Sequence, residues 1–478
     1  MFPIVEETPV YLPPRHVFDS LKNRPFCFLL DSGMDPGKLG RFTFMGSEPF
    51  LIFKSTGRNI SIIQGGQTKA LQGNPFDVLG ELLANFPLEK NSCPVPFTGG
   101  AVGYFSYDLC HFIEKLPASC IDDLRLPECY FAFYDAIIAY DLLAGKSFIV
   151  STGYPETANS NRAERAEKRT AELKDLIYEA FCRRQQSDQD TSRGKEDILL
   201  KSNFSREEYL SAVEKARQYI IAGDIFQVNL SQRFESDLKI APYELYERLR
   251  QVNPAPFAGY LDFRDVAVVS ASPERFLKLS GDLVETRPIK GTRPRGASAA
   301  RDEAMAEELL ASKKDKAENT MIVDLERNDL GRVCEYGTVR VTEWAILETF
   351  PTVFHLTSTV TGKLRPDKNR VDLLKASFPG GSITGAPKVR AMEIIDELEP
   401  TRRSVYTGSM GYLGFNGDMD LNIVIRTFLV KNNRAYFQVG GGIVFDSEPV
   451  EEYKETLDKA RALILALEIS SKVEMVVK

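Results

Sequence analysis

One polar stretch divides this chain of 478 residues into two parts. Residues 183–197 read RRQQSDQDTSRGKED, a run without a hydrophobic side chain, as is typical of a linker. The charged segment before it has sparse apolar positions and predicts a helix over residues 159–182. We therefore divide the chain into an N-terminal region of residues 1–182, a linker of residues 183–200 and a C-terminal region of residues 201–470.

The N-terminal region has the composition of a β-rich fold. Aromatic and β-branched residues concentrate in short runs, such as FCFLLDSG at 26–33 and YFAFYDAIIAYD at 130–141, and Gly, Pro and Asp separate these runs. Runs of this kind, bounded by turn residues, predict strands joined by short connections. We therefore expect residues 1–153 to form mainly β-sheet.

The C-terminal region mixes strands with helices. Ser205 followed by Glu208 is the pattern of a capping box and predicts the start of a helix that runs to residue 222. Long strands with helices inserted between them predict an α+β fold, with mostly antiparallel sheets and helices packed outside. The further predicted helices cover residues 301–329, 386–398 and the segment from 450, and the further strands include 408–415, 422–430 and 435–444.

Composition excludes several classes of function. A net charge of −7 and a pI near 5.4 argue against nucleic-acid binding. Three His make a multi-histidine metal centre a poor expectation, and seven Cys without a CxxC pair fit reduced thiols in the cytoplasm. No apolar run approaches the roughly 20 residues that span a bilayer, and neither a Walker A nor a strand-linked GxGxxG pattern occurs. We expect a cytoplasmic protein that binds no membrane.

Two pairs of acidic residues stand three positions apart, Asp315 with Glu318 and Glu452 with Glu455. This spacing places each pair on one face of its predicted helix. If the two faces meet, they form an anionic, oxygen-only site that suits Mg²⁺. The alternative is that both faces are solvated and pair with neighbouring lysines, namely Lys314, Lys316, Lys454 and Lys459.

Two further residues are candidates for catalysis. Lys290 lies between Pro288, which restricts the backbone, and Gly291, which permits a close approach. A lysine that is held and partly desolvated has a lowered ammonium pKa and a nucleophilic amine, whereas a loop lysine in water has neither property. Glu274, just after a β-rich run, is either a general acid or a surface carboxylate.

A third set of residues could bind an anion. The glycines at 440–442 follow a predicted strand, so their backbone N–H groups could surround a carboxylate. Arg426 in the preceding strand offers two parallel donors, and Tyr406 and His355 could add others. The alternatives are a bulge or close packing at the glycines and an edge-strand salt bridge at Arg426.

Several segments occur together in the order of a known family: GDIFQVNLSQRF, SPERF, RPIKGTRPRG, AENTMIVDLERNDLGRV, SFPGGSITGAPKVRAMEII, YTGSMGY, DLNIVIRTF and GGGIVFDSEPVEEYKETLDKA. Over residues 200–470 the chain resembles the chorismate-binding enzymes. They include component I of anthranilate synthase and of aminodeoxychorismate synthase, and the isochorismate and salicylate synthases. LLDSG and GRFTFMGSEPF resemble the two aminating members more loosely. The resemblance implies a large anthranilate synthase component I-like fold.

The resemblance also implies a role for each candidate residue. Chorismate is a dianion, which the family binds with one Mg²⁺ and basic groups. Glu318 and Glu455 would bind the metal directly, and Asp315 and Glu452 would bind it through water. Glu274 would protonate the departing hydroxyl. The groups that would contact the substrate are Thr292, His355, Tyr406, Arg426, Gly440, Gly441, Gly442 and Lys459.

Two positions discriminate among the family members. The isochorismate and salicylate synthases have a water-activating Lys where this chain has Gln227, which cannot act as a base at neutral pH. The anthranilate synthases have Ala in PIAGT, whereas Lys290 in PIKGT resembles the aminodeoxychorismate synthases. This resemblance implies that Lys290 adds to chorismate before ammonia does, giving 4-amino-4-deoxychorismate, a precursor of 4-aminobenzoate and folate.

The source of ammonia is expected to be a partner. No Cys lies in a G-x-C-x-G pattern, so the chain has no candidate glutaminase site, and a separate glutamine amidotransferase subunit would supply the ammonia. Two alternatives stay open, namely component I of anthranilate synthase and a non-catalytic chorismate-binding or regulatory subunit. The identity of the product distinguishes the first, and the presence of turnover distinguishes the second.

Overall fold

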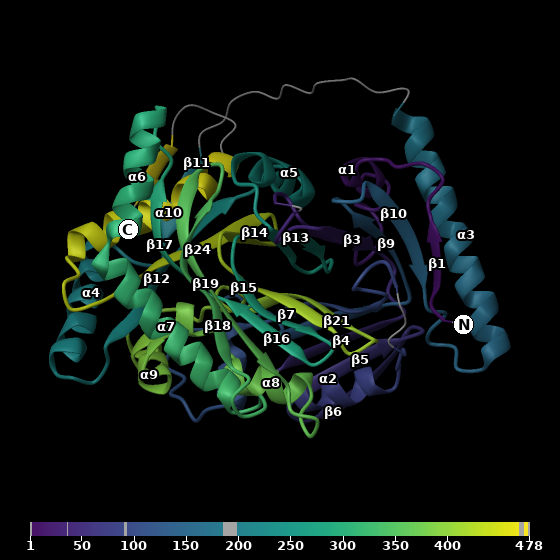
Figure 1. Cartoon of the computed structure of the whole chain (residues 1–478), viewed down its shortest axis with the longest axis horizontal. Helices are drawn as coiled ribbons and strands as arrows, with labels where there is room; N and C mark the ends of the chain where they lie inside the picture. Colours follow the sequence, from purple (N-terminus) through teal and green to yellow (C-terminus); the bar gives the residue numbers. More distant parts are fainter. Residues whose placement is uncertain (1, 36, 90–92, 185–197, 468–472, 477–478) are drawn as a thin grey trace.

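The computed structural model describes residues 2–35, 37–89, 93–184, 198–467 and 473–476. Two large sheets form its centre, and the helices lie on their outer sides (Figure 1). All strand pairs are antiparallel except one, in which β11 and β25 run parallel at the end of the first sheet. The predicted α+β class is therefore confirmed.

The first sheet contains, in order across it, β1 (Ile4–Glu7), β10 (Lys146–Ser151), β9 (Ala136–Asp141), β3 (Phe42–Gly46), β2 (Phe28–Asp31), β13 (Phe257–Asp262), β14 (Ala267–Ser272), β23 (Thr427–Lys431), β24 (Arg434–Ile443), β12 (Gln227–Asp237), β11 (Ile198–Ser202) and β25 (Val473–Val476), with β20 (Gly385–Ala386) also paired to β12.

The second sheet contains, in order, β17 (Ile289–Pro294), β19 (Val353–Lys363), β16 (Leu283–Arg287), β15 (Arg275–Ser280), β22 (Met419–Ile423), β21 (Ser409–Gly414), β7 (Gly100–Phe105), β8 (Cys129–Tyr134), β4 (Leu51–Thr56), β5 (Asn59–Gln64) and β6 (Gln67–Gln72), with β18 (Arg340–Thr349) also paired to β19.

The α-helices are α1 (Pro14–Phe18), α2 (Pro75–Ala84), α3 (Asn159–Arg184), α4 (Arg206–Ile221), α5 (Pro242–Val252), α6 (Ala299–Ala311), α7 (Lys313–Gly331), α8 (Arg370–Ser377), α9 (Lys388–Leu398) and α10 (Pro449–Leu467); two short 3₁₀ helices are η1 (Tyr107–Phe112) and η2 (Gly381–Ile383). None of these described helices is both long enough and apolar enough to cross a lipid bilayer.

Both sheets take strands from both sequence regions. β2 of the N-terminal region pairs with β13, and β7 pairs with β21. The predicted division at residues 183–200 is therefore not a boundary between sheets, and most of that linker, residues 185–197, lies outside the described residues. The N-terminal and C-terminal regions therefore build the two sheets together, because strands of one region pair with strands of the other.

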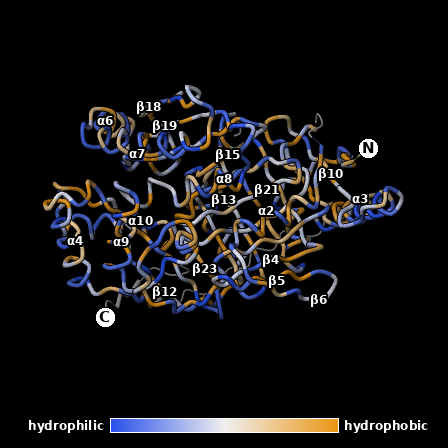
Figure 2. Tube along the Cα trace, turned by 90° about the horizontal axis from the view of Figure 1, so that it is seen from below, coloured by the Kyte–Doolittle hydropathy of each residue, from blue (hydrophilic) through white to orange (hydrophobic). Residues whose placement is uncertain are grey.

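Buried side chains form a core between the sheets and a core on each outer face. Phe28 and Val268 of the first sheet share a cluster with Tyr104 and Met410 of the second, so the sheets pack face to face. α3, α5 and α10 cover the outer face of the first sheet, α2 and α8 cover that of the second, and α9 packs against β12 and β20 of the first sheet. In Figures 1 and 2, α3 lies at the end of the molecule opposite α4, α6 and α7.

Local signals placed the helices well, with one correction. The capping box is confirmed, because the Ser205 hydroxyl accepts from Glu208 N at 3.2 Å and the Glu208 carboxylate accepts from Ser205 N at 2.7 Å. The single helix predicted over 301–329 is wrong, since α6 ends and α7 begins at Ser312. The Ser312 hydroxyl accepts from Asp315 N and starts the second helix in a new direction.

Two predicted strands are also divided. The run at 130–141 becomes β8 in the second sheet and β9 in the first, and the run at 422–430 becomes β22 and β23, again in different sheets. Arg426 lies between β22 and β23 with a φ of 53°, so the prediction that it lies within a strand is wrong. One charged residue lies at each crossing, Asp135 or Arg426, and buried apolar residues flank it on both sides, so periodicity alone does not mark the break.

Candidate active site

The candidate site lies where two chain segments cross between the sheets. β14 passes to β15 through Glu274, and β22 passes to β23 through Arg426. The two crossings run side by side, because Ile423 N donates to the Glu274 carbonyl at 3.0 Å and Ala271 N donates to the Arg426 carbonyl at 3.1 Å. The fold thus places Glu274 and Arg426 at one corner, although they are far apart in the sequence.

Glu274 is a buried carboxyl group, with 4% of its surface exposed. Its Oε1 accepts from Ile289 N at 3.3 Å, and its carboxyl group also bonds the Ser382 side chain. Burial raises the pKa of Glu274 to about 7, although these hydrogen bonds and Lys290 act to lower it. The surface alternative is therefore wrong, and Glu274 can hold a proton near neutral pH.

Lys290 lies on β17, the strand at the end of the second sheet, and is half-buried. Its Nζ donates to the Ser382 carbonyl at 3.0 Å, and it forms no salt bridge with any described residue. Burial lowers the pKa of Lys290, while Glu318 and Glu274 act to raise it. The alternative of a loop lysine in water is therefore wrong.

Three of the four predicted acids converge on the glycines of β24. A Cβ atom on Gly441 would lie 3.0 Å from Glu452 Oε2 and 3.7 Å from Glu455 Oε1. A Cβ atom on Gly442 would lie 2.1 Å from Gln227 Nε2, which donates to Glu318 Oε2 at 3.3 Å. α7 and α10 therefore bring their acidic faces to the same strand, where a side chain at Gly442 would overlap Gln227.

Two of the acids already have cationic partners. Asp315 accepts from Arg293 at 3.1 Å, and Glu455 pairs with Lys459 at 2.7 Å. The predicted alternative of helix-face ion pairing thus holds for Glu455. Lys459 lowers the pKa of Glu455, whereas burial raises the pKa of Glu318 and of Glu452.

The donor set fits a hard cation chemically. Glu318 and Glu452 have no salt bridge with any described residue, and the Glu455 charge acts to raise the pKa of each. A divalent cation between these oxygen ligands would relieve that repulsion. Across the described residues no three His, Cys, Asp or Glu side chains lie close enough to hold a metal ion as they stand. The groups that could hold Mg²⁺ after rearrangement are Glu318, Glu452 and Glu455.

Thr292 and His355 form a side-chain pair beside Lys290. They face each other across β17 and β19, with Thr292 Oγ1 2.8 Å from His355 Nδ1. Burial lowers the pKa of His355 to about 3, and Arg426 and Lys459 act in the same direction. His355 is therefore neutral at pH 7 and can exchange hydrogen bonds with a ligand without adding charge.

Arg426 and Tyr406 line the same corner. The Arg426 guanidinium donates to the Lys459 carbonyl and forms no ion pair with a described residue, so the predicted salt-bridge alternative is wrong. Tyr406 is 8% exposed, and burial raises its pKa to about 12, so it stays a neutral donor. Lys459 Nζ donates to the Gly440 carbonyl at 2.8 Å. Cationic and neutral donors thus meet in one place.

The three glycines lie inside β24, which confirms the strand predicted over residues 435–444, whereas the interpretation that they follow the strand is wrong. Gly440, Gly441 and Gly442 stand opposite Ser231, Leu230 and Asn229 of β12. Successive N–H groups of an extended strand point to opposite edges, so the three cannot face one ligand together. β23 pairs with β24 only as far as Phe437, and no described strand covers that edge beyond it. The edge leaves alternate N–H groups available to an anion.

Sequence reasoning missed two residues that hold the site. Ser382 contacts both Lys290 and Glu274, and its position in SFPGGSITGAPK, a segment shared with the family, was the available signal. Arg403 forms a buried ion pair with Glu399 at 2.7 Å and donates to the Asn229 carbonyl at 2.7 Å. Nothing in the local sequence distinguishes Arg403 from a surface arginine.

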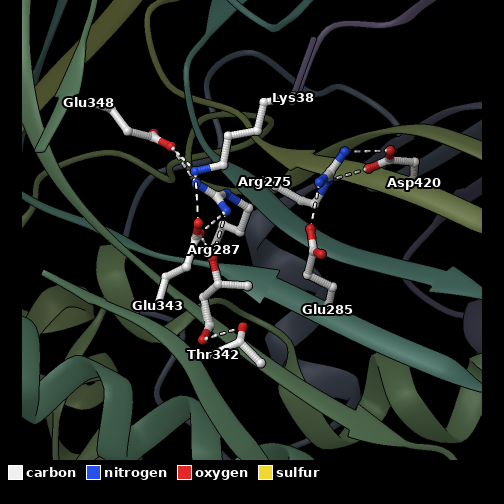
Figure 3. A network of polar contacts seen from close by, with 9 residues as sticks. Lys38, Arg275, Glu285, Arg287, Thr342, Glu343, Glu348 and Asp420 are labelled. Carbon is white, nitrogen blue, oxygen red and sulfur yellow. Dashed lines mark hydrogen bonds and ion pairs between the residues drawn. The ribbon is translucent and has the colours of Figure 1, made fainter. Parts of the chain in front are cut away.

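A network of paired charges lies beside the site on the second sheet (Figure 3). Arg287, three residues before Lys290, donates to Glu343 at 2.6 Å and also to Glu348. Lys38 of the N-terminal region contacts the same two carboxylates at 2.9 and 3.2 Å. These contacts fix the strand that leads to Lys290 and tie it to the N-terminal region.

Comparison with known proteins agrees with this geometry. Residues 40–465 match the family model for chorismate binding enzymes. The chain is 40% identical to anthranilate synthase component 1 of Acetivibrio thermocellus, over 97% of this chain and 93% of that protein. It is also 40% identical to aminodeoxychorismate synthase component 1 of Bacillus subtilis (strain 168), over 91% of each.

A solved structure extends the comparison to the fold. Anthranilate synthase component I from Streptococcus pneumoniae TIGR4 gives a TM-score of 0.78 at 32% identity, covering 96% of this chain and 99% of that one. The predicted anthranilate synthase component I-like fold is confirmed. With a family match over most of its length and the predicted acids, amine and donors gathered at one corner, the chain belongs to the chorismate binding enzyme family.

Proposed function

We propose that the chain is component I of an aminodeoxychorismate synthase, which converts chorismate and ammonia to 4-amino-4-deoxychorismate. A relative with this name and a relative named anthranilate synthase component 1 are each 40% identical to the chain, so overall similarity does not choose between them. The observation that carries the proposal is the Lys290 amine, which is half-buried, has a lowered pKa and contacts only a carbonyl. An amine of this kind can act as a nucleophile when it is deprotonated.

The proposed chemistry uses two displacements. The Lys290 amine forms a bond to C2 of chorismate, the two ring double bonds shift, and the C4–O bond breaks. Glu274 gives its proton to the departing hydroxyl, which leaves as water. Ammonia then bonds to C4, the double bonds shift back, and the C2–N bond to Lys290 breaks. The product ammonium can return a proton to Glu274, so the enzyme is unchanged and the net products are the amine and water.

The substrate is a dianion, and the site offers two cations. Arg426 has no ion pair among the described residues, and Lys459, which also pairs with Glu455, lies beside Gly440 at the open edge of β24. We assign substrate carboxylates to these two groups and to Tyr406. A bound Mg²⁺, held directly by Glu318 and Glu455, would add positive charge there. The water-mediated roles of Asp315 and Glu452 stay predictions.

Ammonia is proposed to come from a glutamine amidotransferase subunit, as expected from the absence of a glutaminase pattern in the sequence. We also place the enzyme in the cytoplasm, because all seven cysteines are free and a reducing compartment keeps them so.

Product identity tests the proposal. Purified chain is incubated with chorismate, Mg²⁺ and ammonium, with and without an added 4-amino-4-deoxychorismate lyase, and the products are separated by chromatography with mass detection. We expect 4-aminobenzoate only when the lyase is present. Anthranilate formed without the lyase would assign the second candidate, anthranilate synthase component I, which the relatives of that name favour. No turnover in either reaction would assign a non-catalytic subunit.

A further inference from the structure

A buried cluster that the proposed chemistry does not use lies behind the Lys290 amine. It contains Glu326 and Asp329 of α7, which are 2% and 4% exposed, and Lys388 of α9. Lys388 Nζ donates to the Asp329 carboxylate and to the carbonyls of Ser377 and Pro379, at 3.0 and 2.9 Å. These contacts occupy all three ammonium donors, so Glu326 has no cation of its own.

Glu326 is held by a single backbone contact. Its Oε1 accepts from Gly381 N at 2.9 Å, and its Oε2 has no hydrogen-bond partner among the described residues. Burial and the neighbouring Asp329 raise the pKa of Glu326. An unpaired buried carboxyl oxygen destabilises a fold by about 1–3 kcal/mol, so stability alone is a poor reason for a carboxyl group here.

The contact to Gly381 fixes the turn that touches both catalytic candidates. Gly381 begins η2, and the next residue, Ser382, accepts from Lys290 Nζ at 3.0 Å and bonds Glu274 through its side chain. The fit is close, since a Cβ atom on Gly381 would lie 3.0 Å from Glu326 Oε1. A shift of this turn would therefore move the groups that hold Lys290 and Glu274.

We propose that Glu326 is a positioning residue for the amination: by accepting the Gly381 N–H it sets the η2 turn, and the turn presents the Ser382 carbonyl to Lys290 and the Ser382 side chain to Glu274. The inference rests on the proposed function for its effect on turnover. The geometric part, Glu326 acting through Ser382 on Lys290, holds whichever product forms.

Two matched variants separate this role from packing. Glu326→Gln keeps an oxygen that can accept from Gly381 N, whereas Glu326→Met keeps the approximate volume and removes the acceptor. Met also removes the unpaired oxygen, so we expect this variant to fold. Asp324→Asn, an exposed change on the same helix, is the control for α7. If Glu326→Met does not fold, Glu326→Asp is measured instead, because its shorter side chain moves the carboxylate away from Gly381.

Turnover and Lys290 reactivity are measured together. For Glu326→Met we expect kcat to fall about 10-fold, the effect of roughly one lost buried hydrogen bond, with KM for chorismate changed less than about 3-fold. Glu326→Gln should stay within about 3-fold of wild type in both. Labelling of Lys290 with acetic anhydride across pH, read by peptide mass spectrometry, should show a lower midpoint only in Glu326→Met, because the ammonium loses the Ser382 carbonyl that stabilises its charged form.

The outcomes are distinct. Wild-type turnover and a wild-type labelling midpoint in Glu326→Met would overturn the inference. So would equal losses in Glu326→Gln and Glu326→Met with an unchanged Lys290 midpoint, because a general packing defect gives that pattern. Formation of anthranilate would instead overturn the proposed function, and the labelling shift would still report the contact through Ser382.

Discussion

Two groups of buried or half-buried cations lie on the second sheet or where the chain leaves it, and they differ in what surrounds them. Arg275 contacts Asp420 and Glu285, and Arg287 contacts Glu343 and Glu348 (Figure 3). Lys290 and Arg426 contact only carbonyl oxygens. A buried charge without a counter-charge is costly, and a bound anion relieves that cost. The first group therefore serves the fold, and the second is kept available for a ligand.

This difference predicts opposite responses to substitution. Changes in the Arg275 and Arg287 network should reduce stability and leave the surviving folded enzyme active. Changes at Lys290 and Glu274 should reduce turnover and leave stability equal or higher. Each of the following experiments measures both quantities, so that a mixed response would contradict the distinction.

The largest effect is expected for Lys290→Ala. Loss of the nucleophile should lower kcat for amination at least about 10³-fold, the scale seen when a covalent catalyst is removed. Thermal unfolding should occur at the same or a higher temperature, because a half-buried ammonium is removed. Initial rates with excess lyase measure the first quantity and calorimetry the second. Lys313→Ala, an exposed change on α7, is the control, and full activity of Lys290→Ala would contradict the proposed chemistry.

Arg287→Met should give the largest loss of stability. It leaves Glu343 and Glu348 without their buried partner, which costs about 3–5 kcal/mol. Burial acts to raise the pKa of Glu343, but bonds from Thr359, Lys38 and Arg287 lower it to about 2, so the carboxylate is charged while Arg287 is present. Urea unfolding measures the loss. Arg327→Met, which breaks an exposed pair with Asp324, should cost less than about 1 kcal/mol, and equal losses would argue against a role for burial.

Glu274→Gln should lower kcat about 100-fold, as expected for loss of a general acid. In wild type, kcat/KM should fall as pH rises through about 7, because the acid form is needed and Glu274 loses its proton there. The Glu274→Gln variant should not show this fall of kcat/KM near pH 7. Since the folded-state pKa is raised, the bound proton also stabilises the fold at low pH, and that contribution is lost as pH rises towards 7. A pH profile identical to that of wild type would contradict the assignment, with the exposed change Glu303→Gln as control.

Lys38→Met should give the smallest effect. Lys38 contacts the same two carboxylates as Arg287, but its side chain is 41% exposed. A solvent-exposed pair contributes less than about 1 kcal/mol and weakens with salt. Urea unfolding at low and high salt should show a small loss that disappears at high salt. A loss as large as that of Arg287→Met would mean that the number of charges, not burial, sets the stability of the network.

The sequence by itself determined those features that depend only on residues close together in the chain. The helix start at Ser205 needs only Ser205 and Glu208, and the acidic faces of α7 and α10 need only a spacing of three residues, so both predictions needed no knowledge of the fold. The order of the family segments likewise indicated which residues would meet. These features depend on backbone geometry within a few residues, which the sequence carries directly.

Only the tertiary structure decided where the chain passes from one sheet to the other and which charged side chains are paired. Glu274 is buried because β14 leaves one sheet for the other beside Arg426, and Ser382 reaches Lys290 from 92 positions away. Asp315 pairs with Arg293, which is 22 positions away on β17. Buried apolar residues flank each crossing on both sides, so periodicity does not mark it, and the sequence around a single charged residue does not show whether a distant partner pairs with it.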